Sequence, residues 1–217
     1  MEFFAFRINK LKILKNREWG EGELKLLSFV TTGDAPLPVL DQLLHTNDPA
    51  AKRQIIQSAS QQVLSAKEFV EIDHIGDGHV MTFGDAGYAL YTADKIPVSF
   101  NWTSLAMESD EDINALGQRI DDIIGSTDFD SFTTNLLTVL ATAATPQITA
   151  GIAIGKFLSR GITKAMIENK DDQVGVYYLS LNRMEHYPHG ERKRDDVPDL
   201  SNNLLVDYSI FGTTYDA

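Results

Sequence analysis

The first thirty residues alternate between apolar and polar positions at the spacing of β-strands. In "FFAFRINKLKIL" the alternation shifts phase by one residue at Asn9 and Lys10, as it does at a β-bulge. The apolar positions on the two sides of this shift are Phe4, Phe6, Ile8, Leu11 and Ile13. The turn "REWGEG" and a second alternating stretch, "ELKLLSFVTTG", follow. Together these segments predict an antiparallel hairpin of two long strands.

A helical spacing starts at Asp48, which is a favourable N-cap in front of Pro49. The apolar residues that follow recur every three or four positions: Ile55, Ile56, Ala59 and Val63. This stripe predicts a helix over about residues 49–67.

Strand spacing returns after residue 69 and again after residue 172. Two glycine-rich turns, Gly76–Gly78 and Gly84–Gly87, separate short strands in the first of these regions. The later apolar positions that alternate are Val98, Phe100, Trp102, Val174, Val176, Tyr178, Leu204, Val206, Tyr208 and Ile210. The segment "MEHYPHGERKRDDVPDLSNN" is polar and contains two prolines, so we predict a long loop there.

Residues 131–155 contain no charged side chain, which raises the question of a membrane helix. Six threonines and Pro146 lie in this window and would be costly in lipid, so we expect no stable transmembrane span. One interpretation is a pair of helices, about 129–144 and 146–168, that pack against a sheet. The other is a helical hairpin that enters a membrane in a pore-forming protein, since Ala, Gly and Thr suit close helix packing in lipid.

The order of these elements predicts the fold class. The chain begins and ends in strands, and helices are inserted at about 49–67 and 129–168. We therefore predict one domain over residues 1–217, mainly β with α insertions: an antiparallel β-sandwich decorated by helices.

The composition excludes several kinds of chemical site, and the N-terminus bears on the expected cellular location. The chain has 217 residues, 43% of them hydrophobic, and no cysteine, which excludes disulfides, thiolate catalysis and cysteine zinc sites. The N-terminus meets charges at Arg7 and Lys10 and has no cleavage motif, so it does not read as a signal peptide. We expect a cytoplasmic protein, or one exported by a route without a classical signal peptide.

The negative charge is concentrated in one third of the chain. The net charge is −12, and residues 71–130 hold thirteen acidic residues and two basic ones. Such a surface repels nucleic acid and anionic lipid unless cations or a basic partner neutralise it. We therefore expect no nucleic-acid partner.

The most acidic stretch, "ESDEDINALGQRIDDIIG" at residues 108–125, has two interpretations. In the first it is a solvated helix that Ser109 caps, with Leu116 and Ile120 facing the core and Gly125 at its end. In the second it contributes to a calcium site, because Ca²⁺ takes six to eight oxygen ligands and clustered carboxylates supply them.

The second interpretation comes with a family resemblance. The D-x-D pattern at Asp110 and Asp112, followed by "DDIIG" at Asp121–Gly125, resembles the third calcium loop of C2 domains, and "DDQVG" at Asp171–Gly175 repeats the second pattern. The start "KILKNREWGEGELKL" is similar to the first strands of that family. The resemblance implies a calcium- and lipid-binding β-sandwich whose metal ligands are Glu18, Glu23, Glu108, Asp110, Asp112, Asp121 and Asp122.

The basic residues Arg192, Lys193 and Arg194 form the one concentrated basic patch, which we predict to bind a partner. His186 and His189 have a spacing that could hold a transition metal together with Asp195 or Asp196, whereas a histidine pair in a basic loop is usually solvated. No P-loop, dinucleotide fingerprint, H-E-x-x-H or G-x-S-x-G motif occurs, so we do not expect an enzyme, although a carboxylate-pair hydrolase stays open.

These observations predict a non-enzymatic binding or interaction module. With calcium bound, it would dock on an anionic membrane surface or on a protein partner. Two alternatives are a metal-free scaffold in a larger assembly and a toxin-like pore former that uses the helical hairpin at 131–155.

Overall fold

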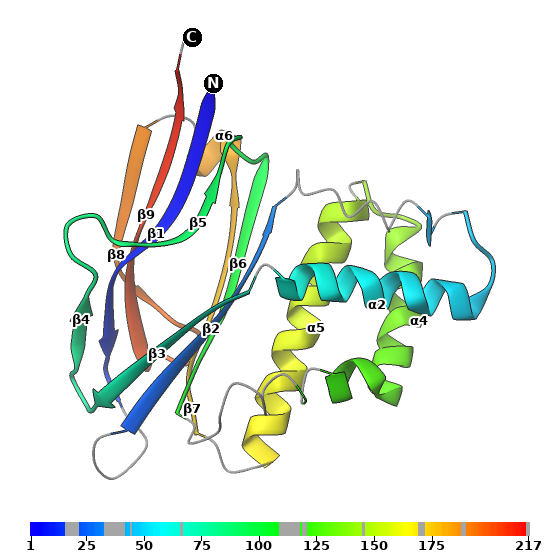
Figure 1. Cartoon of the computed structure of the whole chain (residues 1–217), viewed down its shortest axis with the longest axis horizontal. Helices are drawn as coiled ribbons and strands as arrows, with labels where there is room; N and C mark the ends of the chain where they lie inside the picture. The colour runs from blue at the N-terminus through cyan, green and yellow to red at the C-terminus, as the bar shows by residue number, and fades with distance from the viewer. Residues whose placement is uncertain are drawn as a thin grey trace.

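The computed structural model describes residues 1–15, 22–32, 42–43, 45–65, 67–108, 118, 121–144, 146–168, 172–187 and 190–215. Two antiparallel β-sheets pack face to face, and a layer of helices covers the outer face of one of them (Figure 1). The predicted class, a mainly β sandwich with helical insertions, is confirmed.

The strands and helices follow one another along the chain in this order. They are β1 (Glu2–Ile13), β2 (Gly22–Thr32), α2 (Pro49–Ser65), β3 (Lys67–Ile75), β4 (Val80–Thr82), β5 (Tyr88–Ala93), β6 (Ser99–Glu108), α4 (Thr127–Leu140), α5 (Pro146–Glu168), β7 (Asp172–Asn182), α6 (Arg183–His186), β8 (Gly190–Pro198) and β9 (Leu204–Thr214). The helix α2 lies within the first predicted helical insertion, and α4 and α5 form the second, where α4 begins at Thr127, before the predicted start at residue 129.

The five-stranded sheet has the order β4-β1-β9-β8, and β5 also pairs with β1 beside β4. The register between β1 and β9 shifts between Ile8 and Lys10, so the predicted bulge is confirmed. The shift keeps the apolar side chains of β1 on the buried face on both sides of it: Phe4, Phe6, Ile8, Leu11 and Ile13.

The four-stranded sheet has the order β3-β2-β6-β7. Because β1 and β2 lie in different sheets, the predicted hairpin is wrong. The strand β1 pairs instead with β9 from the other end of the chain, from Glu2 opposite Thr214 to Ile13 opposite Leu204. Alternation shows which side chains share a face, but it contains no information about the partner strand.

The core between the sheets is rich in aromatic rings. Phe6 lies within 4.8 Å of Phe100, 5.2 Å of Trp102 and 5.4 Å of Tyr208, measured between ring centroids. Rings at these separations gain energy beyond the burial of their area. These contacts join β1 and β9 of one sheet to β6 of the other.

The helices α2, α4 and α5 cover the outer face of the four-stranded sheet (Figure 1). Ala150, Ile154 and Leu158 of α5 are fully buried at the spacing of one helix face. They pack in a second core with residues of the sheet that include Leu27 and Leu105. Among the helices that the structure describes, none is long and apolar enough to cross a membrane.

The region 184–203, predicted as a loop, contains α6 and the strand β8, so that prediction is wrong. The strand β8 pairs with β9 from Gly190 to Pro198, with a register shift between Arg194 and Val197. It is polar because it is an edge strand, and charge, a bulge and a terminal proline are common features of such edges. Because the residues of β8 are polar, the sequence pattern did not indicate this strand.

Two assignments of faces also change. Val98 precedes β6 and is 57% exposed, whereas Phe100 and Trp102 are buried as predicted. On β7, the side chains between the sheets are Tyr177, Leu179 and Leu181, while Val176 packs against the helices. Both faces of β7 are covered, so its apolar residues do not distinguish one face from the other.

Candidate functional site

The acidic residues predicted to bind calcium belong partly to one end of the four-stranded sheet. Leu24 pairs with Glu108, and Glu108 pairs with Asp172 on the next strand. Glu23, which is exposed, precedes Leu24. Strand register therefore places Glu23, Glu108 and Asp172 at the same end of three adjacent strands, which we call the acidic end.

The other predicted calcium ligands are not brought to this end by any described contact. Asp121 and Asp122 are exposed in a helical stretch at residues 121–125, where Ile124 is buried. This placement agrees with the interpretation of a solvated helix for these two carboxylates. Glu18, Asp110 and Asp112 lie outside the described residues. Within the described part of the chain, no three acidic or histidine side chains are grouped closely enough to hold a metal ion.

The predicted basic patch lies on β8, where strand alternation divides it between two faces. Arg192 pairs with Ile210 and Arg194 pairs with Tyr208, and both partners belong to the core between the sheets. These two arginines therefore lie on the side of β8 that faces the other sheet. Lys193 lies on the outer face, in an exposed ion pair of 3.8 Å with a glutamate of the same strand.

The edge strands β7 and β8 face each other where the two sheets end on the same side, and we call the gap between them the seam. At one end of the seam, the Val176 N–H donates to Asp199 Oδ2 over 2.9 Å and the Leu200 N–H donates to the Val176 carbonyl over 2.8 Å. At the other end, Arg192 Nη1 donates to the Glu185 carbonyl over 2.9 Å. The seam is thus tied at both ends.

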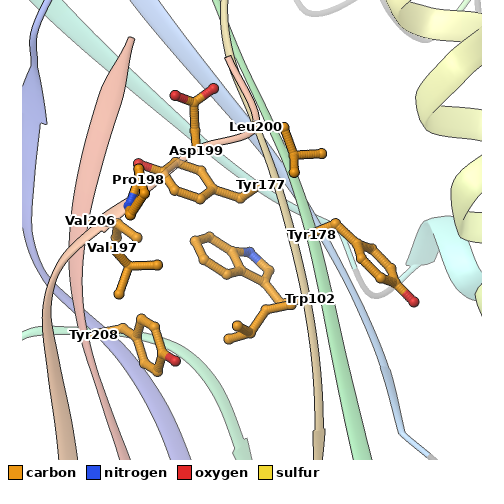
Figure 2. A pocket seen from close by; sticks show the side chains of 10 residues that line it. Trp102, Tyr177, Tyr178, Val197, Pro198, Asp199, Leu200, Val206 and Tyr208 are labelled. Atoms are coloured by element: carbon orange, nitrogen blue, oxygen red, sulfur yellow. The ribbon is translucent and has the colours of Figure 1, made fainter. Parts of the chain in front are cut away.

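A cavity of about 40 Å³ lies within the seam. Figure 2 shows Trp102, Tyr177 and Tyr208 around it, with Tyr178 pointing away towards the helices. The rings of Trp102 and Tyr177 stack with their centroids 5.4 Å apart. A cavity of this size admits a water molecule or a small side chain, whereas a benzene-sized ligand needs a cavity of about 150 Å³.

The Tyr177 hydroxyl is an unusual feature of this cavity. Tyr177 is 4% exposed, and its hydroxyl has no hydrogen-bond partner among the described residues. Burial raises the pKa of Tyr177 well above its usual value, so the phenol stays neutral. A neutral phenol can both donate and accept a hydrogen bond, and leaving it unsatisfied costs free energy.

Asp199 fixes the wall of the seam. Its carboxylate accepts hydrogen bonds from the backbone N–H groups of Val176, Ser201, Asn203 and Leu204, at 2.8–3.0 Å, and one from the Ser201 hydroxyl. Burial alone would raise the pKa of Asp199, but these hydrogen bonds outweigh it and lower the pKa below its ordinary value. The carboxylate therefore acts as a structural anchor between β7 and the turn before β9.

One member of the histidine pair predicted as a transition-metal site has a structural role. His186 Nδ1 accepts a hydrogen bond of 3.1 Å from the Asn182 N–H at the end of β7. His189 lies outside the described residues.

These features define the protein as a two-sheet β-sandwich with one face covered by helices and an aromatic seam between two edge strands. A comparison with known protein families finds no family model that matches the chain, and a comparison with curated proteins finds no match.

The sequence interpretation missed the seam because its residues are distant in sequence. Trp102 was predicted to lie on one face of a strand with Phe100, but the stacking with Tyr177 and the position of Tyr208 depend on strand order. Asp199 had a readable signal, because "PDLSNN" places an aspartate before Ser and Asn, the usual composition of a turn closed by a side-chain carboxylate.

Proposed function

We propose that the protein is a non-enzymatic interaction module that binds an extended segment of another protein as an added strand on β7. The observation that supports this proposal most is the open backbone edge of β7 beside the seam. Addition of a strand to a sheet edge is a common mode of peptide recognition, because main-chain hydrogen bonds provide affinity whatever the sequence.

The direction of the backbone groups of β7 follows from its register. The pairing with β6 is uninterrupted from Gly175 to Asn182, and β7 is the last strand of its sheet. The N–H and C=O of Val176 both bond on the side away from β6. Since alternate residues of a strand share a direction, the backbone groups of Tyr178 and Ser180 point to that same side. No described residue pairs with them there.

The composition of β7 agrees with an edge that accepts a strand. From Gln173 to Asn182 the strand contains no charged residue and no proline. By contrast, β8 carries several charges, a bulge and Pro198, the features that block pairing at an edge. The two edges of the seam thus differ in the property that governs strand addition.

The proposal is tested with a labelled seven-residue peptide of alternating threonine and valine. We expect it to protect the amide hydrogens of Tyr178 and Ser180 from exchange. The variant Ser180→Pro removes the outward N–H without removing a hydrogen bond to β6, so it should abolish binding. Ser180→Ala is the matched control, because both variants lose the Ser180 hydroxyl bond to Asn101 Oδ1.

Strand binding that survives in Ser180→Pro at the affinity of the control would contradict the proposal. Binding by Ser180→Ala and not by Ser180→Pro would sustain it. Both variants should first show the circular dichroism and melting temperature of a folded sandwich.

Calcium-dependent docking, which a C2-like identity implies, stays a prediction with its own test. The placement of Glu23, Glu108 and Asp172 at the acidic end supports it. Excess calcium at a hundred times its dissociation constant should add about 2.7 kcal/mol to the free energy of unfolding. An unchanged melting temperature with calcium, and the same result in Glu23→Gln, would leave the metal-free interaction module.

A further inference from the structure

We infer that the segment accepted by β7 is acidic, with a carboxylate on each of its two faces. This inference rests on the proposed strand addition and specifies the partner. It derives from the cations that border the open part of β7 on both sides of the sheet.

Arg194 provides the positive charge on the inner side of the seam. It is exposed, and it lies close enough to Tyr208 in the cavity wall to oppose the increase in that tyrosine's pKa that burial causes. Arg192, on the same face of β8, is held by the carbonyls of Glu185 and His186 and so has a fixed position. A side chain of an added strand that points to the inner side would therefore meet arginine.

Lys156 provides the charge on the opposite, helix-covered side. Its Nζ lies 4.4 Å from the ring centroid of Tyr178, one of the two residues with open backbone groups. A residue of the added strand opposite Tyr178 has its side chain on the same face as that ring. A carboxylate at that position would lie beside the lysine.

Three carboxylates of this region lie at the ends of the open part of β7 or form an ion pair with another lysine. Asp199 is enclosed by hydrogen-bond donors, Asp196 forms an ion pair of 3.2 Å with Lys10, and Glu185 accepts a bond of 2.7 Å from Asn182 Nδ2. Asp199 keeps its negative charge at the Val176 end, and Lys156 and Arg194 are the cations beside the part of β7 between the two ends. Electrostatic complementarity of this kind selects partners.

The same charges disfavour the simplest alternative, a second copy of this chain paired through its own β7. Two β7 strands related by a two-fold axis would bring Lys156 and Arg194 of each copy towards the same cations of the other. Like charges that face each other across strands are destabilising. An acidic strand meets no such repulsion.

The test compares three labelled peptides that share an alternating threonine and valine frame. The first is neutral, the second has one glutamate on each face, and the third has lysines at those two positions. We expect the acidic peptide to bind about three- to tenfold more tightly than the neutral one and the lysine peptide more weakly than both. The preference for the acidic peptide should become smaller as the salt concentration rises from 20 to 500 mM, because salt screens the interactions between exposed charges.

The matched variant is Arg194→Gln combined with Lys156→Gln, which removes both cations and leaves β7 unchanged. It should bind all three peptides with equal affinity. Equal affinities in the unaltered protein, or a preference for lysine, would overturn the inference while the strand-addition function stands. Failure of all three peptides to bind would remove the proposed function itself.

Two further outcomes would also overturn the acidic partner. One is a dimer that Ser180→Pro dissociates, which would identify a second copy as the occupant. The other is binding to vesicles that contain phosphatidylserine, lost in the double variant and unaffected by Ser180→Pro, which would assign the cations to a lipid surface.

Discussion

The two sheets differ in how many of their faces are covered. On β2 of the four-stranded sheet, all seven residues from Leu24 to Val30 are buried, because one face meets the other sheet and the opposite face meets the helices. On β1 of the five-stranded sheet, Arg7, Lys10 and Lys12 are half-buried on an outer face that no described helix covers (Figure 1).

The difference shows that the number of buried faces determines the pattern of apolar residues in a strand. A strand with one covered face needs apolar residues at alternate positions, which is the pattern of β1. A strand with two covered faces tolerates apolar residues everywhere and buries some polar ones with partners. Ser28 illustrates the second case, since its hydroxyl bonds to Ser104 Oγ over 3.0 Å and accepts from Trp102 Nε1 over 3.1 Å.

The largest expected effect comes from comparing a side chain under the helices with one on the outer face of the five-stranded sheet. Leu105→Ala removes a side chain that is 2% exposed under the helices and should lower the free energy of unfolding by about 2–5 kcal/mol. Phe211→Ala, on the outer face of the five-stranded sheet, should cost about 1–2 kcal/mol because that ring is already partly in water. Urea unfolding measures both, and equal losses would contradict the difference in cover.

The next effect concerns the link between the sheets. Asp199→Asn should lower the free energy of unfolding at pH 7 by about 1–3 kcal/mol, because an amide cannot accept the full set of backbone hydrogen bonds. Urea unfolding at pH 7 measures the loss. Asp195→Asn, an exposed carboxylate of β8, is the matched control and should change stability little.

The same residue predicts a pH dependence. The folded pKa of Asp199 is lowered, so its contribution is fully present above the unfolded pKa of about 3.9 and is lost as the pH falls through the lower folded value. Unfolding measured from pH 7 down to pH 2 should therefore show a smaller acid-induced loss in Asp199→Asn than in the unaltered protein. Parallel curves for the two proteins would refute the assignment.

An effect of similar size tests the packing of the helical layer. A Cβ at Gly161 of α5 would lie 2.9 Å from Ile123 Cγ2, so Gly161→Ala should lower the free energy of unfolding by about 1–3 kcal/mol. Gly155 of the same helix has no atom within 4 Å of such a Cβ. Gly155→Ala should therefore stabilise by about 0.4–1 kcal/mol, because alanine has the higher helix propensity. Opposite signs in thermal melting are the expected result, and a shared sign would contradict it.

The smallest effect lies in the seam. Tyr177→Phe removes a hydroxyl without a described partner, so it should change the free energy of unfolding by less than about 0.5 kcal/mol or increase it slightly. Tyr187→Phe is the contrasting variant, since its hydroxyl donates to the Pro97 carbonyl over 3.0 Å, and it should cost about 1–2 kcal/mol. A larger loss in Tyr177→Phe than in Tyr187→Phe would show that the Tyr177 hydroxyl is satisfied.

Much of the fold could be predicted from the sequence where a strand or helix buries only one of its faces. The alternation of β1, including the phase shift at Asn9 and Lys10, and the stripe of α2 indicated elements that the structure contains. The strand β8 was not predictable by this means, because an edge strand with a solvated face needs no apolar pattern. The candidate site could be predicted least, since Trp102 and Tyr177 come together through strand order and not through spacing.

The sequence by itself determined the mainly β class, the helical insertions, the bulge in β1 and the uneven distribution of charge. Each of these depends on local periodicity or on residue counts, which do not need a partner. The tertiary structure decided that β1 pairs with β9, that β2 is covered on both faces and that β7 is an edge strand, in which no described residue pairs with Tyr178 and Ser180 on the side away from β6. Such features depend on contacts between segments that are distant in sequence. The packing of the whole core determines which of these contacts form.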